Sequence, residues 1–133
     1  MGVRRCLAWP DPLLRRPAEA ISEITEDIHA LCQDMIDTME AMFGVGLAAP
    51  QIDRPIQLAI IEVPGGPSRY GEIEALPLTV FFNPVLTVLD PAEAGYWEGC
   101  LSVPGLRGFV HRPQHVRVDY MDIAGKQASI DLE

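Results

Sequence analysis

One stretch of the sequence has the periodicity of a helix, and the residues after it are typical of strands. Between positions 28 and 43, apolar residues recur at steps of three and four, which forms one face of an amphipathic helix. Thr25 is suited to cap the start of this helix, and Glu26 and Asp27 are favourable in its first turn. Gly44 is suited to end it. The chain is therefore predicted to fold around a single long helix near its N-terminus.

The remaining segments are dominated by apolar and β-branched residues. Prolines at positions 10, 12 and 17 predict an extended opening over residues 9–17 that excludes helix. Residues 64–77 are predicted to form an exposed loop, and Gly125 marks a hairpin turn. The expected strand residues are Gln57–Val63, Leu78–Phe82, Val85–Leu89, Val110, Val116, Val118, Tyr120, Ile130 and Leu132. This order indicates an α+β fold in which one long N-terminal helix packs on antiparallel β-sheets.

Composition narrows the class of protein. A chain of 133 residues with 48% hydrophobic and 22% charged residues fits one domain over residues 1–133. The net charge of −9 argues against a nucleic-acid partner or an anionic membrane. No apolar run approaches the roughly 20 residues of a membrane span. The three cysteines lack the spacing of disulfide or zinc scaffolds, so a cytoplasmic location is expected.

Cys100 is the residue whose setting most suggests chemistry. Gly99 precedes it, Glu98 lies two residues before it and Ser102 two residues after it. Such a turn can expose the sulfur and direct the backbone N–H of Leu101 outward. A thiolate at this position could serve as a nucleophile or as a metal ligand, whereas most isolated cysteines are small buried hydrophobes.

The three histidines offer little support for either use. His111 and His115 have the four-residue spacing of a metal-binding helix, but Pro113 between them would break a helix. In a strand, the two side chains would be separated by roughly 13 Å, too far to share a metal ion. Both are interpreted as surface or edge-strand residues, and His29 as a structural residue of the first helix.

Gln51 follows Pro50 and the segment Gly46-Leu47-Ala48-Ala49, three of whose residues are small. Small residues allow another chain to approach the backbone closely. Considered alone, the glutamine is interpreted as part of a tightly packed strand start, with its side-chain amide facing solvent.

Two segments considered together resemble a known family. Residues 44–51 (GVGLAAPQ) and 98–102 (EGCLS) resemble the first two signature motifs of the peptide deformylases, and the similarity extends from Trp9 through Asn83 to Gly125. The resemblance implies removal of the formyl group from the N-terminal formylmethionine of nascent polypeptides. It also implies an Fe(II) ion, replaceable by Zn or Ni, that is held by one cysteine and two histidines.

The resemblance assigns roles residue by residue. Cys100 would be the metal ligand, and the side-chain amide of Gln51 and the backbone N–H of Leu101 would stabilise the oxyanion. The substrate-binding residues would be Val45, Gly46, Glu98, Gly99 and Arg107. Formylated nascent peptides, and with them the ribosome, are the implied partners.

The third motif of that family, His-Glu-x-x-His on a helix, does not occur in these 133 residues. The domain is therefore expected to be C-terminally incomplete, to lack the family's metal-binding helix and not to hold the metal stably by itself. The leading hypothesis is a deformylase-like chain without activity as written. The alternatives are a non-catalytic module that binds peptides or the ribosome, and a subunit completed by another chain. Apolar surface left by the missing helix would favour self-association.

Overall fold

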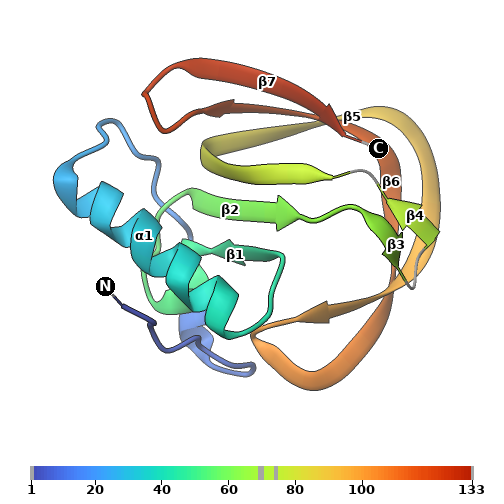
Figure 1. Ribbon diagram of the computed structural model, residues 1–133, viewed down its shortest axis with the longest axis horizontal. Coiled ribbons are helices and arrows are strands. Elements are labelled where there is room, and N and C mark those ends of the chain that lie inside the picture. The colour runs from blue at the N-terminus through green and yellow to red at the C-terminus, as the bar shows by residue number, and fades with distance from the viewer. Residues whose placement is uncertain (1, 69–70, 74, 133) are drawn as a thin grey trace.

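The computed structural model describes residues 2–68, 71–73 and 75–132 as one helix beside a five-stranded sheet (Figure 1). The sheet order is β1-β2-β5-β6-β7, and each neighbouring pair is antiparallel. Its strands are β1 (Gly46–Ala48), β2 (Leu58–Val63), β5 (Leu76–Cys100), β6 (Val103–Met121) and β7 (Gln127–Leu132). The α+β prediction is confirmed. No helix in the described residues is long and apolar enough to cross a membrane.

Helix α1 (Glu26–Ala41) begins where the sequence predicts. The Thr25 side chain accepts a hydrogen bond from the N–H of Ile28 at 3.3 Å and thereby satisfies one unpaired group of the first turn. Glu26 and Asp27 place negative charge at the positive end of the helix dipole.

The end of α1 differs from the prediction. Phe43, not Gly44, adopts the left-handed conformation, with φ of 56°. The N–H of Phe43 bonds to the carbonyl of Glu40, and the N–H of Gly44 bonds to that of Met39 at 3.0 Å. These two bonds form a Schellman motif, which ends the helix before the glycine and turns the chain into β1.

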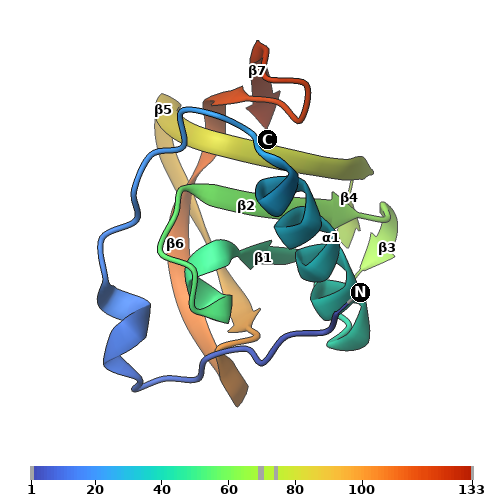
Figure 2. The ribbon, with the colours of Figure 1, turned by 90° about the vertical axis from the view of Figure 1, so that its left-hand side faces the viewer.

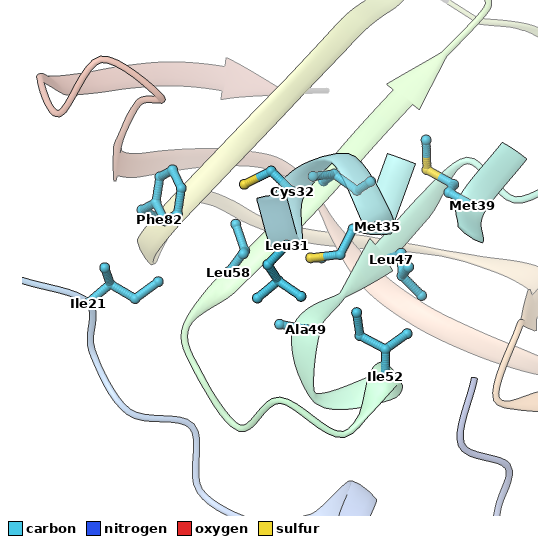
Figure 3. Close-up of a cluster of buried hydrophobic side chains, with 11 residues drawn as sticks. Ile21, Leu31, Cys32, Met35, Met39, Leu47, Ala49, Ile52, Leu58 and Phe82 are labelled. Carbon is cyan, nitrogen blue, oxygen red and sulfur yellow. The ribbon is translucent and has the colours of Figure 1, made fainter. Parts of the chain in front are cut away.

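The main core lies between α1 and the first strands of the sheet. Figure 3 shows side chains from the helix meeting side chains from β1, β2 and β5. Leu31, Met35 and Ile60 are completely buried. The cluster consists of Ile21, Leu31, Cys32, Met35, Met39, Leu47, Ala49, Ile52, Leu58, Ile60 and Phe82. This packing makes the amphipathic face of α1 the organising element of the fold.

The two strands predicted on either side of Asn83 are one continuous strand, β5. Asn83 has φ of 51°, and the register with β6 shifts between Phe82 and Val85. The Asn83 amide bonds to both backbone groups of Ile21, at 2.7 and 2.6 Å. The break in the sequence pattern is therefore a bulge that the N-terminal segment holds in place.

The proline-rich opening does contain a helical turn, so the prediction of residues 9–17 without helix is wrong. The 3₁₀-helix η1 (Pro12–Arg15) starts with proline, whose missing N–H costs nothing in the first turn. The Asp11 carboxylate caps it by accepting from the N–H of Leu13 at 2.9 Å.

The predicted loop at 64–77 also contains regular structure. Strands β3 (Gly66–Ser68) and β4 (Gly71–Ile73) pair as a small antiparallel sheet, and positions 69, 70 and 74 of this segment lie outside the described residues. The hairpin turn at Gly125 is confirmed, because its φ is 82° and its N–H bonds to the carbonyl of Asp122.

Beyond Asn83, strands β5 and β6 continue as a long hairpin of residues 85–100 and 103–119, here called the β5–β6 ribbon, and β7 pairs with β6 at its base. The β5–β6 ribbon curves around the side of the molecule opposite α1, as Figures 1 and 2 show. Many of its apolar residues are exposed, including Val85, Leu86, Trp97 and Phe109.

Candidate functional site

Gln51 is held by a short helical turn that follows an edge strand. After β1, the chain enters the 3₁₀-helix η2 (Ala49–Ile52), and Ala49 and Ile52 anchor that turn in the core. The Gln51 side-chain oxygen accepts from the N–H of Ala48 at 2.9 Å. Since a backbone N–H can only donate, this bond determines which end of the amide carries the hydrogens.

Cys100 lies at the turn between β5 and β6. It pairs with Val103, which leaves Leu101 and Ser102 as the turn residues. The Cys100 side chain is exposed, whereas Ser102 is only 4% exposed. Gln51 Nε2 lies 3.8 Å from Cys100 Sγ and 3.0 Å from Ser102 Oγ. The fold thus brings together the two sequence segments that were separated by about fifty residues of chain.

A groove of about 980 Å³ surrounds this pair. Of the residues that the sequence assigned to a site, Val45, Gly46, Gln51, Gly99, Cys100, Leu101 and Arg107 line it. Sequence reasoning missed Phe43 and Leu106, which also line the groove and are 95% and 64% exposed. Arg107 is the only charged residue among the described ones that line the groove, so the groove offers an apolar surface with one cation.

Gly44 connects the helix end to the Cys100 turn. A Cβ added at Gly44 would lie 2.8 Å from Cδ1 of Leu101. The absence of a side chain there lets the Leu101 turn lie directly against the end of α1. Close approach, and not a left-handed conformation, is therefore the physical reason for glycine at this position.

The free edge of β1 faces the groove. The carbonyl of Val45 accepts from the N–H of Glu62 at 2.8 Å, so the polar groups of Val45 and Leu47 point toward β2. Because backbone groups alternate along an antiparallel strand, those of Gly46 point outward. The chain therefore presents the N–H and C=O of Gly46 to any extended segment in the groove.

Glu98 faces a different part of the molecule. With Arg112 it forms a two-pronged ion pair, at 2.6 and 2.8 Å, beside a second cavity of about 240 Å³ that Tyr96 also lines. The hydrogen bond from Arg112 lowers the pKa of Glu98. The structure therefore brings seven of the predicted residues into one groove and places Glu98 on the other face of the β5–β6 ribbon.

The histidines lie where the sequence places them. His111 and His115 are both on β6, which confirms the strand assignment, and the ring of His111 lies edge-on to Phe109 with centroids 5.3 Å apart. His29 is an exposed residue of α1. Among the described residues, no group of three His, Cys, Asp or Glu side chains could hold a metal ion. The donor set present does not fit a three-ligand iron site.

Two further residues, to which the sequence assigned no role in the site, contact it. Ser102 belongs to the second motif segment, and its hydroxyl contacts the Gln51 amide. Cys6 comes from the N-terminal segment and lies with its sulfur 3.6 Å from Ser102 Oγ. A lone cysteine near the N-terminus carries no pattern that would predict this contact.

Comparison with known proteins gives one consistent result. The family model described as Polypeptide deformylase matches residues 3–133. Peptide deformylase 1 of Nitrosomonas europaea is 45% identical over 130 residues, which cover 97% of this chain and 72% of that protein. Peptide deformylase of Leptospira biflexa is 42% identical over 125 residues, which cover 92% of this chain and 70% of that protein.

A solved structure agrees with the sequence comparisons. The crystal structure of the Ehrlichia chaffeensis peptide deformylase in complex with actinonin has a TM-score of 0.89 and 32% identity, covering 98% of this chain and 75% of that one. Fold, motif geometry and relatives coincide, and the chain belongs to the polypeptide deformylase family.

Proposed function

We propose that residues 1–133 supply the peptide-binding and carbonyl-polarising part of a peptide deformylase. The substrate is the N-terminal formylmethionine of nascent polypeptides, which the resemblance implies, and cytoplasmic ribosomes are the source of such chains. The observation that supports this most is the approach of Gln51 Nε2 to within 3.8 Å of Cys100 Sγ at the edge of the groove.

The groove suits an extended peptide. Its backbone would pair with the outward N–H and C=O of Gly46 as an added strand on β1. Phe43 and Leu106 would contact apolar side chains of the peptide, and Arg107 would offer donors to its carbonyl oxygens. Binding at this edge requires no rearrangement of the sheet, because β1 has a partner on one side only.

The formyl oxygen would lie between two hydrogen-bond donors. One is the Gln51 Nε2 group, whose orientation the bond from Ala48 determines. The other is the backbone N–H of Leu101. Donors that are held in place before the reaction stabilise the negative charge that develops on a carbonyl oxygen under attack.

Cys100 is the proposed metal ligand of these residues. By resemblance the ion would be Fe(II), with Zn or Ni able to replace it. Stable hydrolytic sites use three or more protein ligands, and the described residues that line this groove provide one. We therefore propose that this chain by itself does not turn over formylated peptides.

The catalytic part of the proposal is tested with a formyl-Met peptide and added iron or nickel. We expect no release of formate above the level of a Cys100→Ala variant. Metal-dependent turnover that Cys100→Ala abolishes would show that the described residues suffice for hydrolysis.

The binding part is tested by calorimetric titration with actinonin, which the Ehrlichia enzyme binds, and with the formyl-Met peptide. We expect saturable binding of both. Gly46→Pro should abolish it, because proline removes the outward N–H of the edge strand. Gly108→Ala, where an added Cβ meets nothing within 4 Å, is the matched control. Absence of saturable binding by the folded chain would refute this function.

A second candidate is favoured by the exposed apolar residues of the β5–β6 ribbon. Val85 is 61% and Leu86 69% exposed, which is unusual for neighbouring aliphatic residues of a sheet. Residues outside 1–133, in the same or a second polypeptide, would complete the site by covering them. Sedimentation over a wide concentration range should show self-association of residues 1–133. A compact monomer at every concentration would count against this candidate.

A further inference from the structure

The side-chain amide of Gln51 is useful only if one of its N–H bonds points into the groove. Its oxygen is bonded to the N–H of Ala48 at 2.9 Å. Its nitrogen donates one hydrogen to Ser102 Oγ at 3.0 Å, which leaves the second hydrogen on the side of Cys100 Sγ, 3.8 Å away. Ser102 is thus the partner that holds the nitrogen end of the amide in this direction.

Ser102 in turn needs a partner for its own hydrogen. An amide nitrogen cannot accept a hydrogen bond, so the Ser102 hydroxyl accepts from Gln51. Ser102 is 4% exposed, and the other side chain in contact with its hydroxyl is Cys6, with Sγ 3.6 Å from Oγ. Either atom of this pair could donate. Because a hydroxyl is a stronger donor than a thiol, we assign the hydrogen of this bond to Ser102, which donates it to the sulfur of Cys6.

The backbone reinforces this arrangement. The N-terminal segment Cys6–Trp9 runs past both loops of the site. The N–H of Leu7 bonds to the carbonyl of Gln51 at 2.6 Å, and the N–H of Trp9 bonds to the carbonyl of Ser102 at 2.7 Å. Leu7 is also buried. One short segment therefore ties the Gln51 turn to the Cys100 turn, and Cys6 adds the side-chain contact between them.

We propose that Ser102 and Cys6 are positioning residues that hold the Gln51 amide with one N–H directed into the groove. This inference rests on the proposed function, since it concerns the group that would bind the formyl oxygen. Neither residue touches the peptide; each acts through Gln51. The N-terminal segment is thereby part of the site, although it lies about forty residues from Gln51 in the sequence.

The direct test is the mobility of the Gln51 side-chain amide in the folded 133-residue chain, measured by ¹⁵N relaxation of its Nε2 group. In the unaltered chain we expect an order parameter near that of rigid groups, about 0.85. Ser102→Ala should lower it below about 0.6, the range of flexible groups, and Ser102→Thr should restore it. Cys6→Ala should lower it less, and Cys6→Ser should restore it.

A matched variant separates positioning from general loosening of the N-terminus. Arg4 donates to Asp34 at 2.8 Å, which anchors the same segment away from the site. Asp34→Ala should leave the Gln51 order parameter unchanged, because the bonds of Leu7 and Trp9 remain. A rigid Gln51 in Ser102→Ala, a mobile Gln51 in the unaltered chain, or an equal effect of Asp34→Ala would overturn the inference. If Ser102→Ala does not fold, the variants Cys6→Ala and Cys6→Ser at the half-buried Cys6 provide the same test through the Gln51 order parameter.

Peptide affinity separates this inference from the proposed function. If both hold, Ser102→Ala weakens binding of the formyl-Met peptide about fivefold to tenfold, the effect of one disturbed hydrogen bond. The two can also separate. If the Gln51 amide is rigid in the unaltered chain and mobile in Ser102→Ala, but the unaltered chain binds no peptide, the positioning role is supported and the proposed function is refuted.

Discussion

The helix-covered part of the sheet and the β5–β6 ribbon differ in where their apolar residues lie. Where α1 packs on the sheet, Leu31, Ile60 and Phe82 are 0% exposed. Val85 and Leu86, three and four residues after Phe82, are 61% and 69% exposed. The same strand, β5, contributes to both regions. An apolar strand is thus buried only where a second layer covers it. The groove with Gln51 and Cys100 lies where the two regions meet.

The largest expected effect tests this contrast in stability. Phe82→Ala should lower the free energy of unfolding by about 3–5 kcal/mol, because it leaves a cavity in the core. Leu86→Ala should change it by less than about 0.5 kcal/mol, because the side chain is already in solvent. Guanidinium denaturation measures both. Similar losses in the two variants would mean that the β5–β6 ribbon is covered in solution.

The cysteines provide a second measure of the same contrast. Burial raises the pKa of Cys32 on α1 from 9.0 to about 11. Its thiolate fraction at pH 8 is then about a hundredfold below that of an ordinary thiol. Cys100 is exposed at the groove. Iodoacetamide should therefore alkylate Cys100 at least about a hundredfold faster than Cys32, as followed by mass spectrometry of the separate peptides.

Denaturant is the control for that experiment. In guanidinium the two rates should become equal, since unfolding removes the difference in burial. Rapid alkylation of Cys32 in the folded chain would show that α1 opens readily from the sheet.

A smaller effect is expected at the junction of the two regions. Gly44→Ala places a Cβ 2.8 Å from Leu101 Cδ1. We expect a loss of about 1 kcal/mol, at the low end of overpacking costs because the leucine side chain can rotate away. Adding Leu101→Ala should remove the penalty of Gly44→Ala in a double-mutant cycle. Independent, additive losses would show that the helix end and the Cys100 turn are not in contact.

The smallest expected effect concerns the exposed ion pair of the β5–β6 ribbon. Glu98→Gln should cost less than about 1 kcal/mol at pH 7. The hydrogen bond from Arg112 lowers the pKa of Glu98, so its contribution to stability is full above the ordinary glutamate pKa. It is lost as the pH falls through the lowered value.

Urea denaturation at several pH values checks this sign. The difference between the unaltered chain and Glu98→Gln should shrink as the pH falls below the ordinary glutamate pKa. In a Glu98→Gln background, Arg112→Ala should not change how the free energy of unfolding depends on pH in the acidic range. A difference that stays constant down to the most acidic pH would contradict a lowered pKa in the folded state.

Much of the fold could be predicted because local rules suffice for it. The apolar period of 28–43 and the cap at Thr25 depend only on neighbouring residues, and both are confirmed. The turn at Gly125 depends on one left-handed residue and is also confirmed. Where long-range contacts decide, prediction failed. Gly44 is required by its close approach to Leu101, and Asn83 joins two expected strands into one because Ile21 bonds its side chain.

The candidate site shows the same division. Gln51, Cys100 and the groove residues Val45, Gly46, Gly99 and Leu101 were proposed from two sequence segments by resemblance, and the fold brings the segments into contact. Glu98 lies in the same segment as Cys100 but faces another cavity. Residues two apart on a regular strand share a face, and the register shift between Gly99 and Cys100 interrupts that alternation. Ser102 belongs to the second segment but was given no role there, and Cys6 has no pattern that links it to Gln51.

The amino-acid sequence alone determined one helix, a strand-rich remainder and two segments of chemical interest, since these depend on residues that are close together along the chain. Only the tertiary structure decided which amide hydrogen faces the groove and which apolar residues remain in water. Those outcomes depend on contacts between distant segments, such as Cys6 with Ser102, and on whether a second layer is present to cover a strand.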